Sequence, residues 1–326
     1  MAEVVALGEV LVDFTPAGNS AAGNPLFERN PGGAPANVMS LLAKLGVGTA
    51  FIGKAGDDLF GRGLKAVLEK VGIGTDGLIL SKRYNTTLSF VELDGAGERS
   101  FGFVRRFGAD KMLEPSEVDY SLLDGARVFH FGGVSLTDEP ARSATLAAAR
   151  EAKRRGLLVS YDPNFRAPLW HGDAADVLRE GARLADVLKV SDEECRMLSG
   201  KDDCAEGTEY LSRTFGPSLV FVTFGPKGAA CRLGGEYRTQ PAFRVRTVDT
   251  TGAGDAFLGG ALYCLLRSGK KLSELSADDL DRLLRFGSAA GALVTEKKGA
   301  ILSMPGLAEI ERLLGRGRCP FRPGVK

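Results

Sequence analysis

Hydrophobic and polar positions follow one another along this chain in two rhythms, one typical of buried strands and one of amphipathic helices. Short apolar runs predict strands at 4–7, 49–53, 128–131, 157–161, 187–190 and 219–224. Apolar positions at helical spacing predict helices at 34–45, 59–71, 139–155, 174–184, 192–198, 204–215, 255–267, 278–295 and 307–314. Strands that alternate with helices indicate an α/β fold, with a mostly parallel central sheet flanked by helices on both faces.

Two regions interrupt this alternation. Residues 86–93 and 100–105 alternate like half-exposed strands around the turn Asp94-Gly95-Ala96-Gly97, which predicts a hairpin outside the main sheet. Residues 15–25 are rich in Gly, Asn, Ser and Pro and predict a loop, followed by a short extra strand at 26–29. A second hairpin is expected over 230–239.

An anion site is predicted at Asp249-Thr250-Thr251-Gly252-Ala253-Gly254-Asp255. A β-branched, strand-like run at 243–248 precedes the two glycines, and an apolar helical pattern follows them. The glycines therefore lie at a helix N-terminus, where free N–H groups and the positive end of the helix dipole favour a phosphate oxygen. Asp255 falls in the first turn, either as a reactive carboxylate beside the anion or as one that only complements the dipole.

Composition excludes several classes of protein. A net charge of +1 gives no reason to expect nucleic acid or an anionic membrane as partner. No apolar run approaches the ~18–20 residues that span a bilayer, and the N-terminus does not resemble a signal peptide. The five cysteines are scattered, as expected of free thiols in a reducing compartment, so we expect a cytoplasmic protein. With only two histidines, carboxylate chemistry is favoured over imidazole chemistry.

Two common nucleotide motifs are absent. No glycine-lysine pair in the chain has the spacing of a P-loop. A dinucleotide fingerprint needs a third glycine where Phe257 stands, and the stretch lies far from the first strand. A nicotinamide-dependent oxidoreductase is therefore excluded by the glycine spacing.

Two segments together resemble a known family. The segment 249–255 is similar to the C-terminal signature of the ribokinase-like sugar kinases, the phosphofructokinase-B family, and Gly32-Gly33-Ala34-Pro35-Ala36-Asn37 is similar to the N-terminal signature. Residues 8–13, 162–170 and 295–301 resemble the fructokinases of that family. The resemblance covers essentially the whole chain. It implies one ribokinase-like kinase domain over 1–326, with a small β lid from about 15–30 and 85–107 above the sugar site.

The resemblance also implies substrates, ions and roles for individual residues. It implies ATP, Mg²⁺ and often a monovalent cation such as K⁺, with Asp255 as the base that accepts the proton of the sugar hydroxyl. The amides of Gly252, Ala253 and Gly254 would form the anion hole. The expected sugar contacts are Asp13, at the end of the first strand, and Gly32, Gly33, Asn37 and Arg166. Arg105 would reach down from the lid, unless it is an exposed lid arginine.

For the nucleotide, the resemblance implies a second set of residues. Residues 191–194 match an Asn-x-x-Glu motif in which Ser191 replaces the asparagine, and Glu194 would orient magnesium-bound waters. Thr223, Gly225 and Gly228 match an ATP-binding turn, and Ser288 replaces an asparagine on the adenine side. The positions that match a monovalent cation site are Asp249, Thr251, Val294, Lys297, Gly299 and Ser303.

Three functions remain open on the sequence. The first is an ATP-dependent fructokinase that makes fructose 6-phosphate, and the second is a kinase for a related substrate such as 2-keto-3-deoxygluconate. The third is a non-catalytic, sugar-sensing relative, which is disfavoured because Asp255 and both loop glycines are intact. Lid strands in this family sometimes pair between subunits, so the resemblance also suggests a homodimer through the lid.

Overall fold

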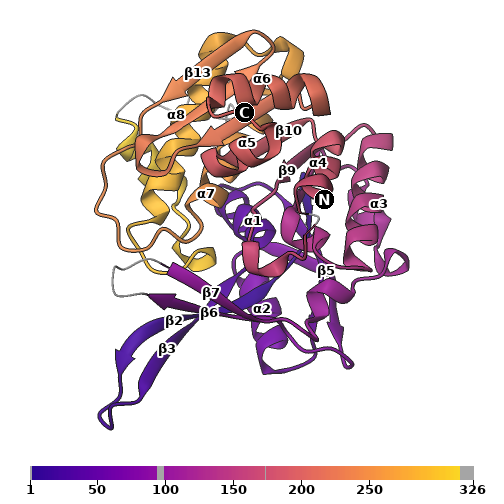
Figure 1. Cartoon of the computed structure of the whole chain (residues 1–326), viewed down its shortest axis with the longest axis vertical. Helices are drawn as coiled ribbons and strands as arrows, with labels where there is room; N and C mark the ends of the chain where they lie inside the picture. Colours follow the sequence, from indigo (N-terminus) through magenta and orange to yellow (C-terminus); the bar gives the residue numbers. More distant parts are fainter. Residues whose placement is uncertain (1, 94–98, 173, 316–326) are drawn as a thin grey trace, which may run out of the picture.

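The computed structural model describes residues 2–93, 99–172 and 174–315 of the 326-residue chain. Within them, nine strands form one large sheet in the order β13-β12-β11-β10-β9-β8-β1-β4-β5. Its strands are β1 (Val4–Leu7), β4 (Thr49–Gly56), β5 (Ile73–Ser81), β8 (Val128–Gly132), β9 (Leu158–Asp162), β10 (Val187–Ser191), β11 (Leu219–Thr223), β12 (Ala229–Leu233) and β13 (Glu236–Gln240). Pairing is parallel from β5 to β11, and β12 and β13 add an antiparallel edge. The predicted α/β class is confirmed (Figure 1).

The helices cover both faces of this sheet. They are α1 (Ala34–Lys44), α2 (Leu59–Lys70), α3 (Ala141–Arg154), α4 (Ala174–Leu184), α5 (Asp192–Ser199), α6 (Cys204–Phe215), α7 (Ala253–Ser268), α8 (Ala277–Val294) and α9 (Leu307–Leu313). Along β1, Val4 and Ala6 belong to the core shared with α1, α7 and α8. Val5 and Leu7 belong to the core shared with α3, α4, α5 and α6. Because strand side chains alternate in direction, one apolar strand supplies both cores.

A second sheet of four strands, in the order β3-β2-β6-β7, lies beside the body. Its strands are β2 (Leu11–Asn19), β3 (Pro25–Gly32), β6 (Leu88–Leu93) and β7 (Arg99–Val104). Figure 1 shows β2 and β3 projecting away from the rest of the molecule. Phe14 stacks on Phe90 with ring centroids 5.0 Å apart and meets Phe60 of α2 edge to face, which fixes the sheet to the body. The predicted turn at 94–97 lies outside the described residues.

The second sheet corrects two expectations. The loop predicted over 15–25 is wrong in its first part, because β2 continues to Asn19. Antiparallel pairing with β3, which includes Pro16 opposite Phe27, holds these turn-forming residues in an extended strand. Asp13 lies within β2 and not at the end of the first strand, because Gly8 to Val10 separate β1 from β2.

Two further differences concern the large sheet. The strand-like run 243–248 is not a strand: Val248 is 51 % exposed, and the amides of Val248 and Asp249 both donate to the carbonyl oxygen of Thr295. β-branched residues favour extended backbone, but a strand also needs a neighbour to pair with. Conversely, β5 was not predicted from the pattern, although it pairs in parallel with β4 from Thr49 onward.

Candidate active site

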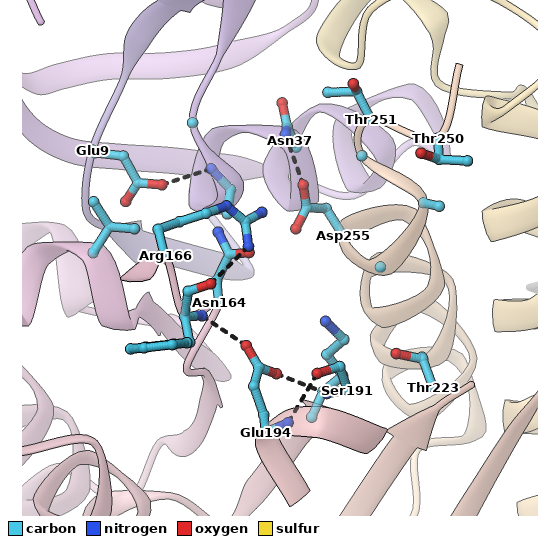
Figure 2. Close-up of a pocket in the computed structure, with 18 of the residues that line it drawn as sticks. Glu9, Asn37, Asn164, Arg166, Ser191, Glu194, Thr223, Thr250, Thr251 and Asp255 are labelled. Atoms are coloured by element: carbon cyan, nitrogen blue, oxygen red, sulfur yellow. Dashed lines mark hydrogen bonds between the residues drawn. The ribbon is translucent and has the colours of Figure 1, made fainter. Parts of the chain in front are cut away.

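A cavity of about 760 Å³ opens where the parallel strands β9, β10 and β11 end (Figure 2). Ser191 and Thr223 are register partners at the ends of β10 and β11, and both line the cavity. Ser89 and Phe103 line it from the second sheet, and the start of α7 closes the remaining side. Ligands of open α/β sheets bind beyond the carboxyl ends of the strands, so the cavity lies where such a sheet holds its substrate.

Asp255 lies in the first turn of α7 and is 8 % exposed. The Nδ2 of Asn37 donates to its Oδ2 at 2.7 Å, a bond drawn in Figure 2 between two residues more than two hundred positions apart in the chain. Burial, together with the nearby Asp162, raises the pKa of Asp255 to about 6. Lys189, Asn37 and Arg166 oppose this rise by stabilising the charged form. The carboxyl is therefore poised to titrate close to neutral pH.

The predicted anion-hole residues form the start of the same helix. Gly252 caps α7 with φ of 79°, and Gly252, Ala253 and Gly254 all line the cavity. The Ala253 amide donates to the Thr250 carbonyl oxygen at 3.2 Å, so an anion would compete with that turn for this N–H. A Cβ on Gly254 would lie 2.8 Å from the Nζ of Lys189, and a side chain there would push the ammonium away.

Most of the predicted sugar contacts line the same cavity as Asp255. Asp13, Gly33, Asn37 and Arg166 line the cavity, and burial raises the pKa of Asp13 to about 6. Gly33 precedes α1 with φ of 118°, a conformation that favours glycine, and a Cβ there would collide with the backbone oxygen of Glu9. Gly32, also predicted, ends β3 opposite Leu11 and does not line the cavity.

Arg105 differs from both expectations. Its side chain is 6 % exposed and does not line the cavity. The guanidinium donates to Asp110 at 2.8 Å, to Thr137 at 2.6 Å and to the carbonyl oxygen of Val134 at 3.1 Å. Arg105 is therefore neither an exposed lid arginine nor a group facing the sugar side. Its hydrogen bond to the carbonyl oxygen of Val134, a residue that lines the cavity, connects Arg105 to the cavity wall.

Glu194, a residue predicted to lie on the nucleotide side, joins two segments of the chain. One carboxylate oxygen accepts the Ser191 amide and the other accepts the Phe165 amide, each at 2.7 Å (Figure 2). The Ser191 hydroxyl accepts the Glu194 amide in return, which makes a reciprocal capping box at the start of α5. Serine therefore serves at this cap in place of the family's asparagine.

Only some of the other residues predicted to bind the nucleotide line the cavity. Thr223 and Gly225 line the cavity, whereas Gly228 and Ser288 do not. Gly228 closes the turn after β11, where its carbonyl oxygen accepts the Phe224 amide. Ser288 is buried on α8, and its hydroxyl has no hydrogen-bond partner within the part of the chain that the structure describes.

Most of the predicted cation positions lie on two loops that Asp249 connects. Its Oδ1 accepts the Thr251 amide at 2.8 Å, and its Oδ2 accepts the Gly299 amide at 3.0 Å. Lys297 pairs with Glu309 at 3.2 Å, the Ser303 hydroxyl donates to the Lys298 carbonyl oxygen, and Val294 ends α8. Among the described residues, no three His, Cys, Asp or Glu side chains are grouped so that they could hold a metal ion.

Several residues that line the cavity, among them Lys189, Glu9 and Asn164, were not singled out from the sequence. Lys189 on β10 forms a buried ion pair with Asp162, the last residue of β9, at 2.9 Å. The Oε1 of Glu9 accepts the Ala34 amide at 2.8 Å, and burial raises the pKa of Glu9 to about 7. Asn164 lines the cavity with φ of 42°. A lysine inside the apolar run 187–190 was the available signal, since unpaired charges are rarely buried in a strand.

Nearly the whole chain aligns with known carbohydrate kinases. The model of the pfkB family carbohydrate kinases matches residues 1–307. Fructokinase-2 of Zea mays is 43 % identical over 320 residues, covering 96 % of this chain and 94 % of the relative. Probable fructokinase-7 of Arabidopsis thaliana is 41 % identical over 333 residues, covering 97 % and 93 %.

Solved structures agree with these relatives. The fructokinase of Xylella fastidiosa with bound ATP superposes with a TM-score of 0.88 at 31 % identity, covering 97 % of this chain and 99 % of the other. The fructokinase of Vibrio cholerae O395 with fructose, ADP and calcium ion superposes with a TM-score of 0.86 at 35 % identity, covering 96 % and 99 %. The chain belongs to the pfkB family of carbohydrate kinases, and it is a sugar kinase. The resemblance inferred from the two signatures is confirmed.

Proposed function

We propose that this kinase is an ATP-dependent fructokinase that transfers the γ-phosphoryl group of ATP to D-fructose and releases fructose 6-phosphate and ADP. The observation that carries the proposal is the buried Asp255, held by Asn37 at the N-terminus of α7. It combines a base with an anion-binding helix end in one cavity. Relatives and structural neighbours that are named as fructokinases support fructose as the substrate.

In the proposed reaction the sugar hydroxyl oxygen forms a bond to the γ-phosphorus while its proton moves to the Asp255 carboxylate. The bond from that phosphorus to the β–γ bridging oxygen breaks, and its electron pair leaves with ADP. The amides of Gly252, Ala253 and Gly254 would bind the charged phosphoryl oxygens during transfer. Asp13, Gly33, Asn37 and Arg166 would hold the sugar, with its reactive hydroxyl beside Asp255.

Two ions belong to the proposal. Mg²⁺ would neutralise phosphate charge, and the Glu194 carboxylate at the cavity wall fits a role in holding magnesium-bound water. A monovalent cation such as K⁺ would lie between the two loops that Asp249 connects, held mainly by main-chain carbonyl oxygens of Thr251, Val294, Lys297, Gly299 and Ser303. A solved double mutant of the fructokinase of Vibrio cholerae O395 with bound potassium ion supports K⁺ as the ion.

The proposal also covers the second sheet, the oligomeric state and the location of the protein. The second sheet would act as the sugar lid of one kinase domain, and its edge strands β3 and β7 would pair between two subunits. Leu26 and Phe27 on β3 are 45 % and 44 % exposed, which supports such a homodimer and can be checked by sedimentation equilibrium. Among the described residues, Cys195, Cys204, Cys231 and Cys264 form no disulfide, which supports a cytoplasmic location. Along the described residues, no helix has the length and apolar character to cross a bilayer.

A panel of substrates tests the proposal. Purified protein with ATP and Mg²⁺ is offered fructose, other hexoses, pentoses and 2-keto-3-deoxygluconate, and ADP release is measured. We expect the highest kcat/KM with fructose. Arg166 in the cavity favours 2-keto-3-deoxygluconate as the second candidate, because its guanidinium could pair with a substrate carboxylate. If that sugar acid were the best substrate, the protein would be a 2-keto-3-deoxygluconate kinase and not a fructokinase. If no substrate were turned over, the remaining function would be that of a non-catalytic, sugar-sensing relative.

The raised pKa values predict how activity depends on pH. Asp255 accepts a proton only when ionised, so kcat should fall about tenfold per pH unit below its pKa of about 6. Protonation of Asp13, whose pKa is also about 6, should raise the KM for the sugar in the same range. Initial rates at saturating and at limiting sugar concentration separate the effect on kcat from the effect on KM. A kcat that stays level down to about pH 5 would contradict the assignment of Asp255.

A further inference from the structure

Lys189 is an unusual feature of the cavity wall. Its side chain lies on β10 and is 7 % exposed, yet Lys189 lines the cavity together with Gly254 and Asp255. Burying an ammonium is costly unless a charge partner and hydrogen bonds compensate. Asp162 supplies one such partner at 2.9 Å, and an ammonium has three N–H donors. Attraction by Asp162, Glu194 and Asp255 outweighs the cost of burial and raises the pKa of Lys189, so the group remains charged.

The ammonium of Lys189 lies beside a second source of positive potential. A Cβ at position 254 would lie 2.8 Å from the Nζ of Lys189, so the charge lies against the first turn of α7. The N-terminus of a helix carries a partial positive charge, and cations stabilise helices at the opposite end. Two positive potentials therefore converge on the side of the cavity where Gly252 and Gly254 lie. An anion bound there would relieve this repulsion.

We propose that Lys189 is a catalytic residue whose ammonium contacts a γ-phosphoryl oxygen of ATP and stabilises the phosphoryl group as it moves to the sugar. The inference rests on the proposed function. The hydroxyl oxygen bonds to phosphorus, its proton moves to Asp255, and the broken P–O bond leaves its electron pair on ADP. Lys189 keeps its protons throughout and supplies charge only, a role in which a positioned cation acts strongly in phosphoryl transfer.

Asp162 is the positioning residue for this ammonium. Its Oδ2 accepts from Lys189, and its Oδ1 accepts the Asn164 amide at 3.1 Å. The segment that Asp162 orients continues to Arg166, which faces the sugar side of the cavity (Figure 2). One carboxylate thus holds both the phosphate-binding cation and the backbone that leads to the sugar-binding arginine.

The test compares Lys189→Met with Lys54→Met. Lys54 is a matched control, because it is 7 % exposed and ion-paired with Glu117 at 2.6 Å but does not line the cavity. We expect Lys189→Met to lower kcat by about 10²–10³-fold with little change in the KM for the sugar. Lys54→Met should lower stability and leave kcat near the wild-type value.

A binding measurement adds a quantity that would not change if the role of Lys189 were only structural. The wild type should bind the non-hydrolysable β,γ-imido analogue of ATP more tightly than ADP, in calorimetry without sugar. Lys189→Met should reduce that preference about tenfold or more. An unchanged preference, or a kcat within about threefold of wild type, would overturn the proposal. If Lys189→Met does not fold, the double variant with Asp162→Asn removes the pair without leaving a buried charge and is measured in its place.

The pH profile distinguishes the two members of the pair. The charges facing Asp255 are Asp162, Lys189, Arg166 and Asp13, and Asn37 donates to it. Loss of the Lys189 charge should move the acid limb of kcat to higher pH, and Asp162→Asn should move it to lower pH. Shifts of the opposite sign would overturn the assignment. An inactive wild type would refute the proposed function instead, while the comparison of analogue and ADP binding would still test Lys189.

Discussion

Replacing Asp255 with asparagine should lower kcat by about 10²–10⁴-fold, the contribution typical of a positioned general base. An amide has nearly the same size as the carboxylate and can still accept the hydrogen bond from Asn37, so the start of α7 should keep its geometry. It cannot accept the proton of the sugar hydroxyl. Binding of ATP and of sugar should therefore remain within a few-fold of wild type, and the loss should appear in kcat. Steady-state kinetics and calorimetry measure the two separately.

Asp281→Asn provides the control for this experiment. Asp281 lies on α8, pairs with Arg238 at 2.6 Å and does not line the cavity. Its substitution should leave kcat unchanged and cost at most about 1 kcal/mol of stability. If Asp255→Asn retained more than about a tenth of the wild-type kcat, a different group would have to accept the proton.

Replacing Gly33 with alanine should weaken both stability and sugar binding. Gly33 has φ of 118°, and a Cβ would collide with the backbone oxygen of Glu9, which has little freedom to move. We expect the free energy of unfolding to fall by about 1–3 kcal/mol, the usual cost of a strained backbone position. Relaxation of the strain should shift the first turn of α1, which carries Asn37, and raise the KM for the sugar about tenfold or more. Urea unfolding and steady-state kinetics check the two effects.

Gly46→Ala isolates the effect of backbone conformation from that of the collision. Gly46 follows the other end of α1 with φ of 78°, but a Cβ there would meet no atom within 4 Å. Its replacement should cost about 1 kcal/mol and leave the KM for the sugar unchanged. Equal KM values for Gly33→Ala and wild type would show that Gly33 does not position the sugar side.

Part of the candidate site could be predicted from the sequence. The predicted residues Asp13, Asn37, Arg166, Glu194, Thr223 and Asp255 come from six separate parts of the chain, and the structure brings them to one cavity. The family signatures identified these residues because the binding of phosphate and sugar constrains the residue types within short, contiguous segments. The pair of Lys189 and Asp162 was missed, since each is ordinary in its own segment and acquires its meaning only from the 2.9 Å contact. Arg105 was misplaced for the same reason, because Asp110, Thr137 and Val134 determine where its guanidinium points.

By itself the sequence determined the α/β class, the succession of most strands and helices, and the family. Those properties follow from local periodicity and from contiguous motifs, as in the apolar run of β1 or the glycines before α7. Only the tertiary structure decided that 243–248 is not a strand, that β2 continues to Asn19, and that the Lys189 ammonium lies against the start of α7. Each of these features depends on a neighbour that is distant in the chain. A strand needs a partner for its backbone hydrogen bonds, and a buried charge needs a partner of opposite charge, so a residue's own segment does not determine either.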